Sequence, residues 1–347
     1  MASRAGTTVG RPGVDLPDVT TYLYGGSSGL PLFIEPAGER VTSLEGTLAW
    51  FGDHREQLDT LVTEIGAVVL RGFPIDTTPA FGALVEGYDS DEHGYVVGAA
   101  PRAQVEGRVF EATKAPAPLR IGLHQEMAYL PHFPAKLAFY CLRPSETGGE
   151  TIIGDMRRFT DLVPPRFRDA VKERGVQYRR NFRSPDWSSG DANLDLMHKP
   201  WPDAFGTADP RAAEAACLNM GLQYEWVDGS LTVLYNAPGF LEHPVTGQEV
   251  WFNQIATMSN SVEYNGAERL ALTQRLYGDR PWPLDTRFGD GAPIPPSDVS
   301  SLYPALDEVT VAFPWQHGDV MLLDNLNTAH GRNPFTGERD VQVSLLY

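Results

Sequence analysis

The sequence has few cysteines and no long run of apolar residues. It contains 2 cysteines in 347 residues, Cys141 and Cys217, and each lies among apolar neighbours. Two isolated cysteines do not make a disulfide framework, so we expect both to be small buried residues in a reducing compartment. No apolar run approaches the roughly 18 residues that a membrane span requires, and no N-terminal signal pattern is present. These absences predict a cytoplasmic protein.

Positive charge is also scarce. Lysine and arginine total 28 against 45 aspartates and glutamates, which gives a net charge of −17 at pH 7. Binding to phosphate backbones needs clustered basic residues that release counterions, so this balance argues against a nucleic-acid partner. The same charge would repel an anionic membrane surface. We therefore expect neither nucleic acid nor a membrane as a partner, and an oligomer is possible.

The chain is predicted to form one large domain over residues 18–347, because residues 1–17 are rich in Gly, Thr and Arg and are typical of a flexible tail. Short apolar stretches bounded by Gly and Pro predict strands, and four stretches have helical periodicity. The expected strands cover 68–71, 138–142, 231–235, 309–313, 320–323 and 341–346, and the expected helices cover 44–65, 159–174, 212–221 and 267–277. This pattern favours a mainly β fold with flanking helices, a double-stranded β-helix of the cupin-like jelly-roll kind.

Two long segments, 183–210 and 278–306, show little regular pattern. Loops of this length within a compact domain are usually functional lids or disordered connections. The first contains Trp187, Trp201 and Phe205 among Ser, Gly, Asp and Pro. Aromatic residues in a loop suggest that it packs onto something, so we expect these segments to be lid-like insertions over the active site.

Two histidines and a glutamate form the strongest candidate site. Side chains at positions i and i+2 of a strand point to the same face, so His124 and Glu126 can reach one ion while Gln125 points away. His330, near the C-terminus, follows an apolar stretch and precedes Gly331-Arg332. Two imidazoles and one carboxylate are the ligands of the facial triad that holds mononuclear Fe(II) and leaves coordination positions open. The same donors can also bind Zn(II) in hydrolases.

Beyond these three residues, the sequence resembles the taurine dioxygenase-like (TauD/TfdA) family of Fe(II)- and 2-oxoglutarate-dependent oxygenases. The likeness covers roughly residues 61–347, and its strength lies in the order and spacing of several short motifs. These motifs are Gly66–Phe73, His124–Glu126, Phe139–Pro144, Gly148–Thr151, His243–Gly247, Val250–Gln254, Asp324-Asn325, His330–Arg332 and Gly337–Arg339.

The resemblance implies that His124, Glu126 and His330 are the iron ligands. It also implies that Arg339 binds the distal carboxylate of 2-oxoglutarate and that the hydroxyl of Thr151 shares this carboxylate. A planar guanidinium presents a fork of donors that suits a carboxylate. The cosubstrate would chelate the iron through its 2-oxo acid end and leave one position for O2.

Three residues close to the ligands in sequence, Arg120, Gln125 and Arg332, are candidates for contacts with a polar substrate. Arginines beside such sheets also often pair with backbone carbonyls, which is the alternative interpretation for Arg120 and Arg332. The predicted substrate contacts therefore rest on proximity in sequence to the metal ligands.

Two departures from the taurine-type pattern narrow the implied substrate. Val343 stands where taurine-type members carry a second arginine for their anionic substrate, so a sulfonate is not expected. Glu126, rather than Asp, is typical of the subgroup that resembles clavaminate synthase and the amino-acid hydroxylases of natural-product pathways, and a carboxylate here argues against the halogenating branch. The implied reaction is hydroxylation of an unactivated C–H bond of a small metabolite, an amino acid either free or tethered to a carrier protein.

Other outcomes and other classes stay open at this point. Desaturation, ring closure or epimerisation could replace hydroxylation without any change in the ligands. A zinc-dependent hydrolase would use the same three donors, but it would leave Arg339 and Thr151 unexplained. A cupin-like binding protein without catalysis would not need a complete set of metal ligands.

Overall fold

The computed structural model describes residues 15–24, 29–89, 104–113 and 115–347. Most of the expected tail, residues 1–14, lies outside this range. The last residues of that tail are packed, because Leu16 is buried and the carbonyl oxygen of Pro17 accepts a hydrogen bond from the indole of Trp50 at 2.8 Å. The ordered domain therefore begins before residue 18.

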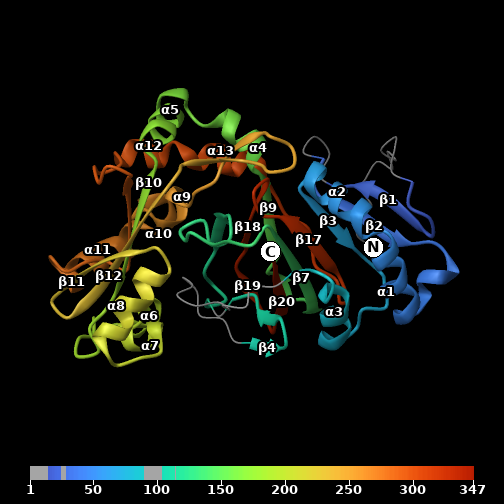
Figure 1. Ribbon diagram of the computed structural model, residues 1–347, viewed down its shortest axis with the longest axis horizontal. Helices are drawn as coiled ribbons and strands as arrows, with labels where there is room; N and C mark the ends of the chain where they lie inside the picture. Colours follow the sequence, from blue (N-terminus) through green and yellow to red (C-terminus); the bar gives the residue numbers. More distant parts are fainter. Residues whose placement is uncertain (1–14, 25–28, 90–103, 114) are drawn as a thin grey trace.

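Two β-sheets form the middle of the molecule (Figure 1). The larger has the strand order β1-β2-β3-β17-β7-β20-β5-β4, and the smaller has the order β16-β9-β18-β6. The large sheet contains β1 Val19–Leu23, β2 Leu32–Pro36, β3 Ala67–Leu70, β4 Gln104–Glu106, β5 Val109–Glu111, β7 Lys136–Arg143, β17 Val320–Asp324 and β20 Asp340–Leu346. The small sheet contains β6 Ile121–His124, β9 Thr151–Asp155, β16 Thr310–Val311 and β18 Thr328–Arg332.

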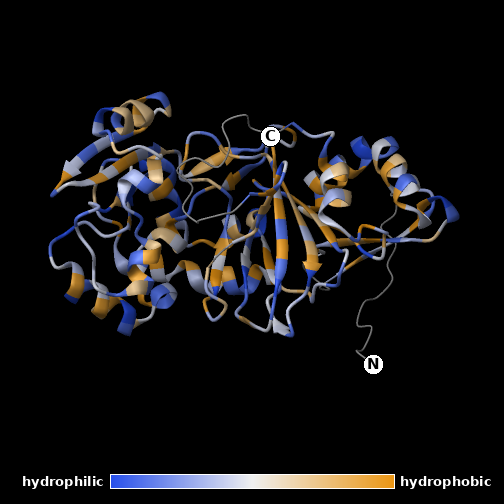
Figure 2. Cartoon of the chain, turned by 90° about the horizontal axis from the view of Figure 1, so that it is seen from below, coloured by the Kyte–Doolittle hydropathy of each residue, from blue (hydrophilic) through white to orange (hydrophobic). Residues whose placement is uncertain are grey.

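An apolar core joins the two sheets. Ile152 and Ile153 of β9 and Val341 and Val343 of β20 are all at most 4% exposed, and they belong to one cluster of buried side chains. Figure 2 shows apolar residues concentrated along the central strands. Buried apolar residues of both sheets thus share one core, which is the arrangement expected of a jelly roll.

Helices of the N-terminal region cover one end of the large sheet (Figure 1). The helix expected over 44–65 is two helices, α1 Leu44–Asp53 and α2 Arg55–Ile65, with non-helical backbone at His54. The helix expected over 159–174 is likewise α4 Met156–Leu162 and α5 Pro165–Arg174, and the break falls at Val163-Pro164. Pro164 has no N–H to continue the helical hydrogen bonds, which explains the break. A short 3-10 helix, η2 Glu39–Thr42, precedes α1, and α3 Thr78–Val85 follows β3.

A second lobe is inserted between β9 and β17 (left in Figure 1). Its sheet has the order β11-β12-β10-β15. The strands are β10 Val176–Phe182, β11 Gln223–Val227, β12 Ser230–Ala237 and β15 Leu284–Phe288. The helices are α6 Ala192–Met197, α7 Trp201–Phe205, α8 Pro210–Asn219, α9 Ile255–Met258, α10 Val262–Asn265, α11 Ala267–Tyr277, α12 Pro296–Ser300 and α13 Leu302–Val309. Two small two-stranded sheets complete the described chain. One is the hairpin of β13 Phe240–Glu242 with β14 Glu249–Trp251, and the other pairs two segments distant in sequence, β8 Thr147–Gly148 and β19 Phe335–Thr336.

The prediction that 183–210 and 278–306 lack regular structure is wrong. They contain α6, α7, β15, α12 and part of α13. Most of these elements are only five or six residues long, and α6 begins at a local cap, where the Asp191 carboxylate accepts the N–H groups of Asn193 and Leu194. Such short elements do not produce a periodic pattern. The strand expected over 309–313 is reduced to β16, because α13 continues to Val309.

The remaining expectations agree with the structure. The other expected strands correspond to β3, β7, β12, β17 and β20, and the helices over 212–221 and 267–277 correspond to α8 and α11. Both cysteines are buried free thiols. No helix in the described ranges is both long enough and apolar enough to span a bilayer.

Candidate metal centre and substrate cavity

Strand pairing brings the two histidines together across two hundred residues of sequence. His330 lies in the middle of β18, and its Cα partners are His124 at the end of β6 and Ile153 of β9. Glu126 comes from the turn that follows β6 rather than from the strand itself, because β6 ends at His124. The expected common strand face for His124 and Glu126 is therefore replaced by a strand end and a tight turn.

The three side chains lie close enough to share one ion. One donor atom from each of His124, Glu126 and His330 lies within 4.8 Å of the others. The two imidazole centroids are 4.4 Å apart, and Nε2 of His330 lies 3.5 Å from a carboxylate oxygen of Glu126. Glu126 and His330 are 3% and 4% exposed. A buried carboxylate beside two imidazoles fits a divalent cation, because the cation offsets the cost of burying the negative charge.

Backbone contacts fix the orientation of two of these residues. Nδ1 of His124 lies 2.9 Å from the carbonyl oxygen of Gly122, which leaves Nε2 for a metal. The buried amide of Asn325 holds the backbone of Glu126 from both sides. Its oxygen accepts the Glu126 N–H at 2.7 Å, and its nitrogen donates to the carbonyl oxygens of Glu126 and Pro134. Asn325 thus ties the turn that carries Glu126 to the loop between β17 and β18.

A buried pair, His243 and Asp324, supports the same loop. Nδ1 of His243 accepts the N–H groups of Val245 and Thr246, so its proton is on Nε2, which donates to Asp324 at 3.0 Å. The other oxygen of Asp324 accepts the backbone N–H groups of residues 326 and 327. These bonds order the turn that leads into β18 and therefore position His330.

Arg339 and Thr151 lie side by side, as the resemblance implies. A terminal nitrogen of Arg339 is 3.5 Å from the hydroxyl of Thr151, and its Nε donates to the carbonyl oxygen of Gly149 at 2.8 Å. The indole of Trp315 donates to the same hydroxyl at 3.1 Å. Burial lowers the pKa of Arg339 to about 10, and the nearby positive charge of Arg332 adds to this effect. A buried guanidinium beside a hydroxyl suits the distal carboxylate of 2-oxoglutarate.

Gly149 permits this arrangement. Its φ is +72°, and a Cβ there would lie 2.4 Å from the hydroxyl of Ser145 and 3.1 Å from Cδ of Arg339. Any side chain at this position would push Arg339 away from Thr151, so the Gly-Gly turn contributes directly to the shape of the pocket.

The three residues expected to contact the substrate point elsewhere. The amide nitrogen of fully buried Gln125 donates to the carbonyl oxygens of Trp251 and Leu326. The terminal nitrogens of Arg332 donate to backbone carbonyls of residues 115, 116 and 119. Arg120 is half-exposed and faces Asp307 at 3.8 Å. None of the three lines the cavity described next, so the structure runs against their predicted role and favours a structural one.

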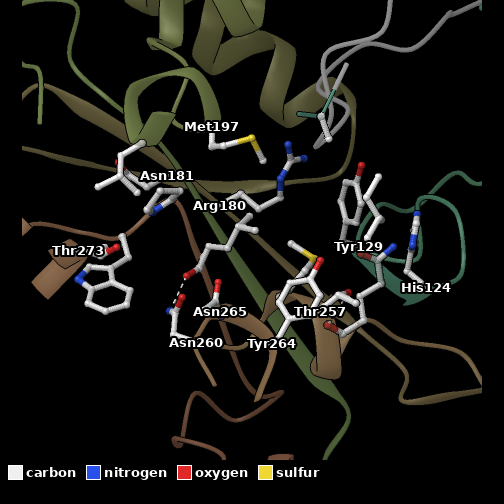
Figure 3. A pocket seen from close by; sticks show the side chains of 18 of the residues that line it. His124, Tyr129, Arg180, Asn181, Met197, Thr257, Asn260, Tyr264, Asn265 and Thr273 are labelled. Atoms are coloured by element: carbon white, nitrogen blue, oxygen red, sulfur yellow. Dashed lines mark hydrogen bonds between the residues drawn. The ribbon is translucent and has the colours of Figure 1, made fainter. Parts of the chain in front are cut away.

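A cavity of about 250 Å³ opens beside the metal residues. His124 and Glu126 line it together with side chains from β10, α6, α9, α10 and α11. In Figure 3, His124 and Tyr129 lie on one side, Asn181 and Thr273 lie on the other, and Arg180 and Met197 lie between them. Most of its walls therefore come from the inserted lobe.

The charged residues of this lobe are not among the site residues expected from the sequence. Arg180, Lys199 and Arg269 all line the cavity. A signal for Arg180 was present, because it alternates in phase with Val176, Tyr178 and Phe182, which are buried. A charged residue at an inward position of a strand is unusual and marks a candidate site.

Comparison with known proteins identifies the family. The model of the "Taurine catabolism dioxygenase TauD, TfdA family" matches residues 34–345. The chain belongs to the TauD/TfdA family. It is 35% identical over 297 residues to a clavaminate synthase-like protein of Arabidopsis thaliana, covering 84% of each chain. It is 32% identical over 290 residues to the dapdiamide synthesis protein DdaC of Enterobacter agglomerans, covering 83% of this chain and 84% of DdaC.

Solved structures agree at the level of the fold. PvcB from Pseudomonas aeruginosa superposes with a TM-score of 0.53 at 14% identity, over 96% of this chain and 93% of that one. A second structure of PvcB, described as an Fe, alpha-ketoglutarate dependent oxygenase from an isonitrile synthetic pathway, gives 0.52 at 15% identity, over 96% and 93% of the two chains. The predicted jelly-roll fold is confirmed, with sheets that are not closed.

Family membership also settles the cofactors. The TauD/TfdA protein described here is an Fe(II)- and 2-oxoglutarate-dependent dioxygenase that uses O2. His124, Glu126 and His330 fit the iron, and Arg339 with Thr151 fits the cosubstrate, on the geometry given above. A zinc-dependent hydrolase and a binding protein without catalysis are not supported.

Proposed function

We propose that this oxygenase hydroxylates an unactivated C–H bond of an amino acid in a natural-product pathway. The observation that carries the proposal is a cavity of about 250 Å³ that is lined by His124 and Glu126 and combines apolar walls with several polar and charged side chains. This volume suits a small metabolite. Two relatives support the substrate class and the pathway, since one is named clavaminate synthase-like and the other is a dapdiamide synthesis protein.

The residues of the site have separate tasks in this proposal. His124, Glu126 and His330 would hold the iron, which, when bound with 2-oxoglutarate and O2, supplies the oxidising chemistry. Arg339 and Thr151 would hold the distal carboxylate of 2-oxoglutarate and so orient its other end toward the iron. The cavity walls orient the carbon to be oxidised and exclude water from it.

The test is a substrate screen on protein purified without O2. Fe(II), 2-oxoglutarate and O2 are added, and succinate is measured with each of a panel of amino acids, free and loaded on a carrier protein. We expect one amino acid to raise succinate formation well above the rate without substrate and to gain the mass of one oxygen atom. If no amino acid in either form raises succinate formation, the proposed substrate class is wrong.

The same mass measurement separates the alternative outcomes. Desaturation and ring closure each remove two hydrogens, whereas epimerisation leaves the mass unchanged and alters only the stereochemistry. Any of these products would retain the cofactors and the amino-acid substrate, and would replace hydroxylation as the reaction.

A further inference from the structure

The cavity is positively charged in a chain that is strongly acidic. The net charge is −17, yet the described lining contains three cationic side chains, Arg180, Lys199 and Arg269, and a single carboxylate, Glu126. Glu126 is one of the three metal residues, so a bound divalent cation would offset its negative charge. The remaining cavity charge is therefore positive and favours an anionic ligand.

Arg180 is held in a fixed position by aromatic rings. It lies near the end of β10, paired with Val233 of β12 and Leu284 of β15, and is 4% exposed. Its guanidinium carbon lies 4.6 Å from the ring centre of Tyr129 and 5.3 Å from that of Phe182. A guanidinium that is already oriented loses little freedom on binding a carboxylate, which raises affinity.

Lys199 is a second cation close to Arg180. Burial lowers the pKa of Lys199, and the positive charge of Arg180 lowers it further. Within the part of the chain that the structure describes, no hydrogen bond or ion pair engages the Lys199 ammonium. An anion bound between two cations relieves their mutual repulsion.

The residue before Lys199 holds this part of the wall in place. His198 is 2% exposed, and its two ring nitrogens lie 2.9 Å from the hydroxyl of Tyr277 and 2.9 Å from the side-chain oxygen of Asn181. Asn181 follows Arg180 on β10, and His198 precedes Lys199. The contact between Asn181 and His198 therefore holds the backbone next to both cations. These hydrogen bonds hold Lys199 beside β10 in the structure.

We infer that Arg180 and Lys199 bind a free carboxylate of the substrate, so that the enzyme acts on the free amino acid and not on its carrier-bound thioester. The inference rests on the proposed function. Attachment to a carrier converts the carboxylate into a neutral thioester and removes the charge that the two cations recognise. A charge-assisted pair with guanidinium and ammonium is among the stronger contacts available to a small ligand.

The test compares acids with matched amides. The probes are the standard L-amino acids and their C-terminal amides, titrated without O2 into enzyme loaded with Fe(II) and 2-oxoglutarate. Tryptophan fluorescence reports binding, because Trp282 lines the cavity, and equilibrium dialysis gives the dissociation constants. We expect at least one acid to bind and its amide to bind at least about tenfold more weakly.

Variants locate the effect. Arg180→Gln and Lys199→Met should each weaken binding of the acid at least about tenfold while leaving binding of the amide nearly unchanged. The matched control is Arg179→Gln on the same strand, because Arg179 pairs with Glu225 of β11 and does not line the cavity. Circular dichroism checks folding, and if Arg180→Gln does not fold, Lys199→Met alone decides.

Three results would overturn the inference: equal binding of acid and amide, an unchanged preference in both variants, or no binding by any acid. They can be separated from failure of the proposed function. Turnover of a carrier-bound amino acid, at a rate that neither variant changes, would keep the oxygenase function and remove the carboxylate subsite. Absence of turnover with every amino acid, free or carrier-bound, would remove the proposed function itself.

Discussion

The site has two ends that are built in different ways: the sheet end, which carries the metal and 2-oxoglutarate residues, and the substrate end, which is the cavity. The metal residues and the 2-oxoglutarate residues lie on, or directly beside, paired strands, and strand register alone sets His330 opposite His124. The substrate cavity is walled by short helices and by β10 of the inserted lobe. A one-residue slip in the sheet would displace every ligand, whereas the lobe can change without disturbing the sheet. Chemistry and substrate choice are therefore separable in this fold.

The largest expected effect is on iron binding at the sheet end. Replacing His330 with alanine removes one of three donors, so we expect iron binding to be lost and succinate formation to fall to background. The matched control is His132→Ala, an exposed histidine that should change neither quantity. Iron content of the purified protein is the measurement, and a His330→Ala protein that keeps one iron per chain would break the assignment of ligands.

The next effect concerns the cosubstrate. Arg339→Gln removes the buried guanidinium, and we expect the KM for 2-oxoglutarate to rise about a hundredfold, with the affinity for iron little changed. Arg143→Gln is the control, because Arg143 pairs with the exposed Glu338 at the surface. Steady-state kinetics with varied 2-oxoglutarate measure the change. An equal change in both variants would mean that Arg339 does not contact the cosubstrate.

The pH dependence of 2-oxoglutarate binding is a second test of the role of Arg339. Burial lowers its pKa to about 10, and only the protonated guanidinium attracts a carboxylate. Binding of 2-oxoglutarate should therefore be constant up to about pH 9 and weaken as the pH rises through 10. The Arg339→Gln protein should lack this dependence, which separates Arg339 from other groups that titrate in the same range.

The contrast between the two ends also explains what the sequence could predict. His124 and Glu126 are two residues apart, and the motifs around Thr151 and Arg339 occur in a fixed order, so local spacing was enough for the sheet end. Proximity in sequence to the metal ligands did not predict the contacts of Gln125, because its side chain points away from His124 and Glu126 and donates to buried backbone carbonyls. It failed for Arg332 because its guanidinium binds a backbone loop.

The substrate end could not be predicted in the same way. Arg180 and Lys199 line the same cavity only because β10 pairs between β12 and β15 and because the chain returns through α6. These contacts depend on the register of the inserted sheet and on helices of five or six residues, which have no periodic signature. The pattern of β10 alone indicated a buried charge, but it did not indicate which cavity that charge would face.

A substitution of Asn325, which contacts the turn that carries Glu126, tests whether iron binding requires this turn to be held in place. Asn325→Ala removes three hydrogen bonds that fix the backbone of Glu126 and the nearby Pro134 carbonyl. We expect a 10- to 100-fold loss of iron affinity, roughly the effect of removing a group that orients a metal ligand. Asn333→Ala is the control, since its side chain donates a hydrogen bond to Glu150 and not to the turn that carries Glu126. Unchanged iron affinity in Asn325→Ala would mean that the turn is rigid without this amide.

Stability of the lobe should depend on His198. Burial lowers the pKa of His198 to about 4, from an ordinary value of 6.5. The unfolded chain then binds the proton more readily, so this histidine lowers stability as the pH falls from 6.5 toward 4, by up to about 3 kcal/mol. The His198→Gln protein should lack this part of the acid sensitivity. Urea unfolding at pH 7 and pH 4.5 measures it, and parallel losses in both proteins would contradict the assignment.

The smallest expected effect concerns the segment 183–210, which we still predict to act as a lid. Leu194, Met197 and Lys199 of this segment line the cavity, and Leu196 beside them is 52% exposed. A ligand that contacts the cavity wall should reduce local opening of α6, so iron, 2-oxoglutarate and a bound amino acid should slow chymotrypsin cleavage after Leu196 by a few-fold. Cleavage after Leu218 of α8, which is 62% exposed and outside the cavity, is the internal control. Equal rates with and without ligands at Leu196 would show that the lobe is a fixed wall, and substrate selection would then depend on its shape alone.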